Sequence, residues 1–172
     1  MFIKLNEMSE DMKRNIFIIC TVVMMVMIFC FSMENSSESA HRSGGVTEFI
    51  LKTFVRDYQN MSVSEKKHIL KELEHIIRKL AHFSIYTVLG FLASSAIGRR
   101  KLFSTGSLIT LIFGFLYACS DEFHQYFVPG RSCQFKDVVI DTCGVVTGII
   151  ISMAVFRIYG VFKHKLSGYS PR

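Results

Sequence analysis

Four stretches of the sequence are long, apolar and almost free of charge, and they constrain the fold more than any other feature. Each is 19 residues long; the first three contain no Asp, Glu, Lys or Arg, and the last contains one acid, Asp141. They are Asn15–Met33, Leu80–Gly98, Leu102–Ser120 and Val138–Phe156. A 19-residue helix spans about 28 Å, close to the thickness of a bilayer's hydrocarbon core. The stretches predict one all-α domain over residues 1–172, an integral membrane four-helix bundle.

The distribution of basic residues predicts how this bundle is oriented. The chain carries 20 Lys and Arg against 14 Asp and Glu, a net charge of +6. The basic residues that flank the stretches on one side are Lys4, Lys13, Arg14, Arg99, Arg100, Lys101, Arg157, Lys163, Lys165 and Arg172. The positive-inside rule then places both termini and the 99–101 turn in the cytoplasm, and the acidic hairpin 121–137 outside. Since topology accounts for the positive charge, we expect no nucleic-acid partner.

The segment between the first two stretches, residues 34–79, is predicted to be an external loop with short helices of its own. Ser43-Gly44-Gly45 is expected to break any helix, so an interfacial helix is predicted only over Val46–Tyr58. Ser62 and Glu65 have the spacing of a capping box, and apolar residues follow at helical spacing. This amphipathic helix is expected either to lie on the outer membrane surface or to extend the second membrane helix outward.

The five cysteines show no metal-binding spacing. Cys20, Cys30 and Cys143 lie inside apolar stretches and are interpreted as small core residues. Cys119 and Cys133 could both reach the outer face, so a disulfide between them is the less favoured alternative.

Helical projections bring the polar residues onto shared faces. At about 100° per residue, Asp137, Asp141, Gly144 and Gly148 lie on one narrow stripe of the fourth membrane helix. The two glycines form a GxxxG pattern, which permits another helix to approach closely in lipid. The two acids are therefore expected to face a neighbouring helix and not the lipid.

The second and third membrane helices have similar polar faces at the same end of the bundle. On the third helix, Glu122 projects about 100° to the side of Asp121. In the hairpin, Pro129-Gly130 predicts a tight turn. The polar residues that the predicted topology gathers at the outer end are Lys79, His82, Tyr86, Asp121, Glu122, His124, Gln125, Arg131, Asp137 and Asp141.

Acids at a membrane boundary are costly, which favours a functional site over a purely structural role. A structural ion-pair network, with Lys79 and Arg131 neutralising Asp121 and Asp137, is the alternative. The candidate catalytic residues, for general acid–base chemistry, are His82, Asp121, Glu122, His124 and Asp137. The candidate ligand-binding residues, for a polar or anionic lipid headgroup, are Lys79, His82, Tyr86, Asp121, Glu122, Gln125, Arg131, Asp137 and Asp141. Metal binding by the carboxylates and His124 also stays open, and the sequence identifies no cofactor.

Three ordered motifs between Lys79 and Gly148 resemble those of the VanZ-like family. They are Lys-Leu-Ala-His-Phe-x-x-Tyr from residue 79, Asp-Glu-x-His-Gln-x-Phe-x-Pro-Gly-Arg from residue 121, and Asp-x-x-x-Asp-x-x-Gly-x-x-x-Gly from residue 137. The third motif has an acid, Asp141, where the family often has asparagine. The family is named for a protein that gives resistance to the glycopeptide antibiotic teicoplanin. The resemblance implies the bacterial cell envelope and an outward-facing site, and it implies no particular reaction.

Together these features predict a multi-pass protein of the bacterial cell membrane with a charged pocket at its outer face. The predicted ligand is a membrane lipid or a lipid-linked or amphiphilic envelope molecule, which the protein binds and, in one version of the hypothesis, modifies. A contribution to teicoplanin-type resistance would be an analogy with the family. The alternative is a non-catalytic scaffold subunit whose charged cluster docks another membrane protein. The sequence does not settle the oligomeric state or whether the protein is an enzyme.

Overall fold

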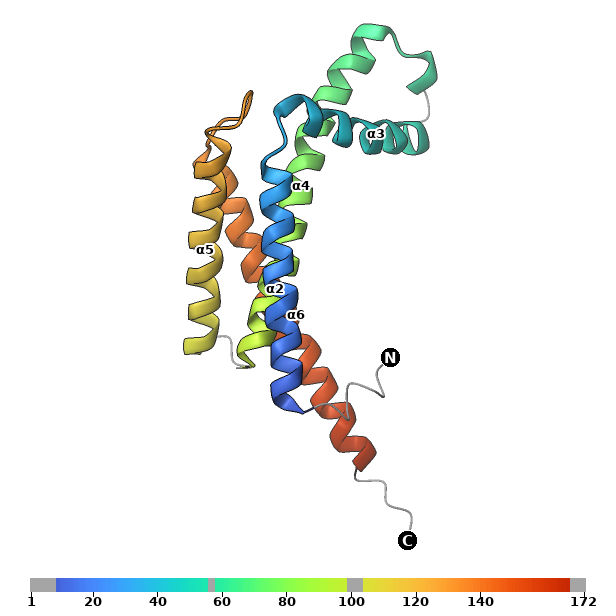
Figure 1. Ribbon diagram of the computed structural model, residues 1–172. Coiled ribbons are helices and arrows are strands. Elements are labelled where there is room, and N and C mark those ends of the chain that lie inside the picture. The colour runs from blue at the N-terminus through green and yellow to red at the C-terminus, as the bar shows by residue number, and fades with distance from the viewer. Residues whose placement is uncertain (1–8, 56–57, 99–103, 168–172) are drawn as a thin grey trace.

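The computed structural model describes residues 9–55, 58–98 and 104–167, which form five α-helices, a short 3-10 helix and no strand. The elements are α2 (Glu10–Ser32), α3 (Ser36–Phe54), η1 (Tyr58–Asn60), α4 (Val63–Ile97), α5 (Thr105–Gln125) and α6 (Phe135–Ser167). Helices α2, α4, α5 and α6 run side by side along an elongated bundle, and α3 projects sideways at one end (Figure 1). The predicted all-α class is confirmed.

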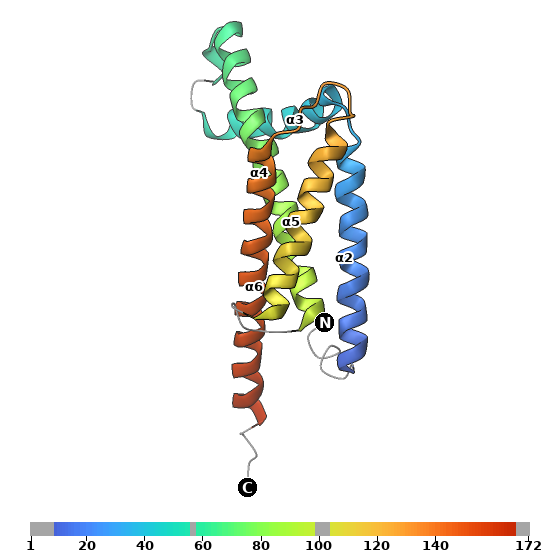
Figure 2. The same cartoon turned by 90° about the vertical axis from the view of Figure 1, so that its left-hand side faces the viewer.

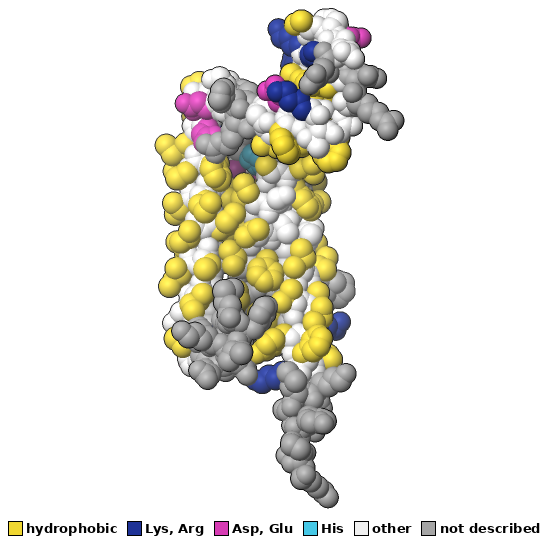
Figure 3. All heavy atoms as spheres, turned by 90° about the vertical axis from the view of Figure 1, so that its right-hand side faces the viewer, with side chains coloured by type: hydrophobic (Ala, Val, Ile, Leu, Met, Phe, Trp, Pro, Cys, Tyr) yellow, Lys and Arg dark blue, Asp and Glu magenta, His cyan; other side chains and the backbone are white. Residues whose placement is uncertain are grey.

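The four long helices have the length and composition of membrane spans. Their outward-facing side chains are large and apolar, among them Ile19, which is 61% exposed, and Leu116, which is 59% exposed. Figure 3 shows a continuous band of hydrophobic side chains, with charged side chains gathered beyond its ends. A band of this extent, on helices long and apolar enough to cross a bilayer, fits a membrane-spanning surface. The four predicted spans are therefore confirmed.

Side-chain caps set the beginnings of the helices. Ser62 Oγ accepts a hydrogen bond from Glu65 N at 3.3 Å, and Glu65 Oε2 accepts one from Ser62 N at 2.9 Å, as predicted for a capping box. Asn35 and Glu38 form the same motif at the start of α3. Both boxes satisfy backbone N–H groups that would otherwise have no partner in the helix.

The prediction that Ser43-Gly44-Gly45 breaks the helix is wrong, since α3 is continuous from Ser36 to Phe54. The physical reason is tertiary packing. Two glycines cost about 1 kcal/mol each in a helix, but α3 packs against α4 and buries Thr47 and Leu51. Burial of one side of α3 outweighs the weak local preference, so the helix begins ten residues before the predicted start at Val46.

Helix α4 is a single helix of 35 residues, about 52 Å long. Its first turns extend past the bundle beside α3 (Figure 2), so α4 continues the membrane helix in line and does not bend onto a surface. The start of α2 and the end of α6 lie together at the opposite end. The orientation was predicted partly from Lys4, the 99–101 turn and Arg172, which lie outside the described residues. Lys165, another of the basic residues used, lies in α6. The orientation stays a prediction.

Helices α4 and α6 make the most extensive contact in the bundle. A Cβ atom added to Gly144 would collide with the carbonyl oxygen of Phe83, and one added to Gly148 would collide with that of Thr87. The two backbones therefore touch where the GxxxG pattern lies, as its spacing predicts. This contact holds the polar residues of α6 opposite those of α4.

The cysteines are placed differently from the prediction. Cys20, Cys30 and Cys143 are exposed on the outer faces of their helices, so they are not core residues. In a membrane span an apolar side chain gains nothing by facing inward, because the lipid is as apolar as the core. Cys119 and Cys133 are free, so the alternative of a disulfide between them is not realised.

Candidate functional site

The hairpin between α5 and α6 folds back over the end of the bundle nearest α3. Arg131 N donates a hydrogen bond to Val128 O at 3.1 Å, and Gly130, between them, has a φ of 75°. With Pro129 before that glycine, the turn has the signature of type II, as the Pro-Gly pair predicts. The turn brings Arg131 to the end of α2, where its Nη2 donates to Phe31 O at 3.2 Å.

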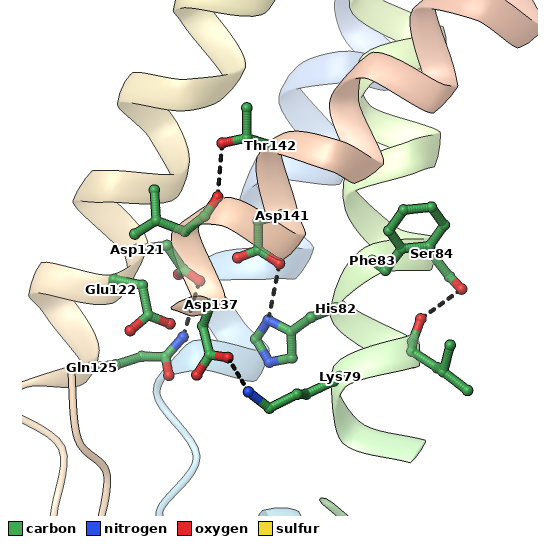
Figure 4. Close-up of polar contacts among 12 residues, drawn as sticks. Lys79, His82, Phe83, Ser84, Asp121, Glu122, Gln125, Asp137, Asp141 and Thr142 are labelled. Carbon is green, nitrogen blue, oxygen red and sulfur yellow. Dashed lines mark hydrogen bonds and ion pairs between the residues drawn. The ribbon is translucent and has the colours of Figure 1, made fainter. Parts of the chain in front are cut away.

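A cavity of about 150 Å³ lies where this hairpin meets α4, α5 and α6, and we call it the polar pocket. Seven of the predicted ligand-binding residues line it: Lys79, His82, Glu122, Gln125, Arg131, Asp137 and Asp141. Figure 4 labels six of these seven residues, all except Arg131, and shows that their side chains point toward one another from α4, α5 and α6. The helical faces deduced from the sequence therefore meet in one place.

The outer part of the polar pocket contains an ion pair between two helices. Lys79 Nζ on α4 lies 2.7 Å from Asp137 Oδ1 on α6, and the two side chains are 26% and 27% exposed. This pair joins the same two helices as the glycine contact. The positive charge of Lys79 is therefore already matched within the protein.

One helical turn deeper, two carboxylates and an imidazole lie close together. His82 Nδ1 is 3.7 Å from Asp141 Oδ1, and Asp141 is completely buried. Asp121 is 4% exposed, and its Oδ2 accepts a hydrogen bond from Gln125 Nε2 at 3.1 Å. One ligand atom from each of His82, Asp121 and Asp141 lies within 4.8 Å of the others, so this trio could hold a metal ion.

Glu122 occupies a different place from the one its helical projection predicts. The projection sets it to the side of the polar face, but it is 1% exposed and lines the polar pocket. Its Oε2 accepts a hydrogen bond from Gln134 N at 3.0 Å. The projection alone does not bring Glu122 into the pocket because it considers one helix, whereas here the returning hairpin covers the side of α5; the prediction of Glu122 as a pocket residue agrees with its position.

Tyr86 and His124 do not line the polar pocket. Tyr86 is completely buried in the apolar core, where its ring centroid lies 6.2 Å from that of Tyr117. The His124 ring lies 4.8 Å from Phe29 of α2. Both rings lie between helices, outside the lining of the pocket.

The sequence analysis missed four residues with polar side chains that also line the pocket: His75, Arg78, Ser132 and Gln134. His75, Arg78, Lys79 and His82 are spaced i, i+3, i+4 and i+7 and therefore share one face of α4. This polar stripe could have been found beside the apolar stripe of the same helix. Arg78 Nε is buried and has no hydrogen-bond partner among the described residues.

The charges of the pocket are mixed. Its lining includes the cations Arg78, Lys79 and Arg131, and the acids Glu122, Asp137 and Asp141. Burial lowers the pKa of the Arg131 guanidinium, and the nearby charge of Arg78 lowers it further. Arginine nevertheless stays charged at neutral pH. Two arginines therefore lie at the pocket in addition to the matched pair of Lys79 and Asp137.

Four helices of membrane-spanning length, with a charged cavity near one end of their bundle, are the architecture of a multi-pass membrane protein. The sequence matches the VanZ/LLP1 family over residues 17–157, and the chain belongs to that family. The match includes most of the first membrane helix, as well as the three motifs. Searches of curated proteins and of solved structures gave no significant match.

Proposed function

We propose that this VanZ-like protein binds the phosphate-bearing headgroup of a lipid-linked or amphiphilic envelope molecule in the polar pocket. The observation that supports this most is the pair of arginines, Arg78 and Arg131. Both line the pocket, and neither is ion-paired among the described residues. A guanidinium offers a planar fork of donors that matches the oxygens of a phosphate.

The size of the pocket limits what it can hold. A volume of about 150 Å³ has room for several water molecules. Pockets for drug-sized ligands are typically about 300–1,000 Å³. The pocket therefore suits a headgroup whose acyl or prenyl chain stays in the lipid, and it is too small for a whole glycopeptide antibiotic. A contribution to teicoplanin-type resistance would act through an envelope lipid.

We also propose that the polar pocket and α3 lie on the outer face of the membrane, with both termini in the cytoplasm. The start of α2 and the end of α6 lie at the other end of the bundle (Figure 2), and Lys13, Arg14 and Lys163 line a cavity there. Basic residues are retained on the cytoplasmic side. This orientation presents the pocket to lipids of the outer leaflet.

A scaffold role is the second candidate, and one observation favours it. The ion pair between Lys79 and Asp137 and the bond from Arg131 to the end of α2 tie separate helices together. Charged groups used in this way need no ligand. A scaffold would copurify with a partner membrane protein and would show no preference for phosphate.

The experiment compares two short-chain lipids that differ only in the phosphate. Thermal unfolding of the purified protein in detergent is followed with dioctanoyl phosphatidic acid and with dioctanoyl glycerol. We expect only phosphatidic acid to raise the Tm. Arg131→Ala should weaken its binding about tenfold or more, since a charge-assisted hydrogen bond contributes about 1.5–3 kcal/mol.

Arg131→Lys and Lys163→Ala complete the comparison. Arg131→Lys keeps the charge but loses the fork, so we expect an intermediate affinity. Lys163 lies on α6 at the other end of the bundle, so Lys163→Ala should bind as the wild type does. Equal responses to both lipids, or equal losses in Arg131→Ala and Lys163→Ala, would contradict headgroup binding in this pocket.

A further inference from the structure

His82, Asp121 and Asp141 form a trio of potential metal ligands below the ion pair of the pocket. The proposed binding of a headgroup by Arg78 and Arg131 does not require them. The members of the trio come from α4, α5 and α6, one from each helix, and Figure 4 shows them pointing toward a common point. Metal–ligand bonds of about 2.1 Å place two ligands of one ion at most about 4.2 Å apart. The ligand atoms here lie within 4.8 Å of one another, so a contraction of less than about 1 Å would bring them around an ion.

The burial of Asp141 makes this arrangement costly without a cation. The residue is 0% exposed, and neither carboxylate oxygen has a hydrogen-bond partner among the described residues. His82 Nδ1, at 3.7 Å, is beyond hydrogen-bond distance. An isolated buried carboxylate costs several kcal/mol. A divalent cation between Asp141 and Asp121 would offset that cost for both acids.

The surroundings hold the ligands in place. Gln125 binds one oxygen of Asp121, as residues behind a metal ligand commonly do. Asp141 lies one turn before Gly144, where the backbones of α4 and α6 are in contact. The nearby cation Lys79 is paired with Asp137. These contacts leave the oxygens of Asp141 available for an ion.

We propose that His82, Asp121 and Asp141 bind one divalent metal ion at the base of the polar pocket. One imidazole and two carboxylates suit Zn²⁺ or Mn²⁺ better than Mg²⁺, which prefers oxygen ligands alone. Three protein ligands leave a coordination position open, and His82 and Asp141 also line the pocket. The site goes beyond headgroup binding and does not depend on it.

The test uses the metal alone. The full-length protein in detergent is stripped with a chelator and dialysed against Zn²⁺ or Mn²⁺, and bound metal is measured by elemental analysis. We expect about one ion per chain, a higher Tm with metal, and an electron paramagnetic resonance signal of bound Mn²⁺. Asp141→Asn and His82→Gln should each weaken binding about 100-fold or more, since even residues behind a ligand affect affinity 10–100-fold.

Glu72→Gln is the matched control for metal binding, because Glu72 lies exposed on α4, the helix of His82, outside both the pocket lining and the trio. It should keep one ion with an affinity within about threefold of the wild type. In chelator, Asp141→Asn should be as stable as the wild type or more stable, since it removes a buried charge. His82→Gln keeps the test decisive if Asp141→Asn fails to fold. Absence of stoichiometric metal in the wild type, or equal metal affinity in His82→Gln and Glu72→Gln, would overturn the site.

Discussion

The interface between α4 and α6 has two regions of opposite character. Around Gly90, Gly144 and Gly148 there is no room for one additional carbon atom between the helices. Toward α3, the same two helices carry the pair Lys79 and Asp137 and border a cavity of about 150 Å³. The first region is apolar and closed, and the second is charged and open.

This difference indicates a division of labour along one helix pair. In lipid, helices associate through close van der Waals contact of small residues, so the glycine region should account for most of the stability. Charged groups near a membrane boundary are costly and contribute less. The close contact in the glycine region fixes the distance between α4 and α6. The pocket forms where the same two helices, held at that distance, carry charged side chains. Substitutions in the two regions should therefore differ in their effect on unfolding.

The largest effect is expected in the glycine region. A Cβ at Gly148 would overlap Thr87 O, so Gly148→Ala should lower the free energy of unfolding by about 1–3 kcal/mol. Gly160 lies on the same helix with nothing within 4 Å of its added Cβ. Gly160→Ala should cause no loss and a gain of up to about 1 kcal/mol. Denaturant or thermal unfolding in detergent measures both, and equal effects would mean that the close contact does not stabilise the bundle.

A smaller effect is expected for the ion pair of the open region. Lys79→Ala and Asp137→Ala should each cost about 1 kcal/mol, between the values for surface and buried pairs, because both side chains are about a quarter exposed. The double variant should lose less than the sum, with a coupling of about 1 kcal/mol. A double-mutant cycle measures this coupling. Strictly additive losses would show that the interaction between Lys79 and Asp137 contributes nothing to the free energy of unfolding.

The smallest effect is expected for a hydrogen bond at the far end of the interface. Ser95 Oγ and Ser152 Oγ lie 3.0 Å apart and buried between α4 and α6. Ser152→Ala should cost about 0.6 kcal/mol, the average for such bonds between membrane helices. Ser84→Ala is the control, since Ser84 is exposed and bonds to Leu80 O of its own helix. If Ser152→Ala costs more than Gly148→Ala, the polar contact and not the glycines dominates.

Much of this arrangement follows from periodicity in the sequence. The apolar stretches determine the four spans, and the 100° spacing of residues determines the shared faces of Lys79, His82, Asp137 and Asp141. Ser62 and Glu65 gave the start of α4 because a capping box is a local interaction. These features depend on residues within a few turns of one another, which is the range that a helical pattern describes.

The features that the sequence did not predict depend on contacts between elements. The continuity of α3 through Gly44 and Gly45 depends on packing against α4. The burial of Glu122 depends on the backbone of Gln134, which a projection of α5 does not contain. Arg78 lies on a polar stripe of α4 whose place at the pocket depends on the hairpin and on α6, which the pattern of α4 alone does not contain.

Headgroup binding from the outer leaflet requires the polar pocket to face outside, and Cys133 tests this most directly. Cys133 lies exposed in the hairpin beside the pocket. A variant that keeps only this cysteine should react with a membrane-impermeant maleimide in intact cells. Lys163→Cys in a cysteine-free background, at the other end of the bundle, should react only after permeabilisation. The reverse pattern would place the pocket in the cytoplasm and contradict a site for outer-leaflet envelope lipids.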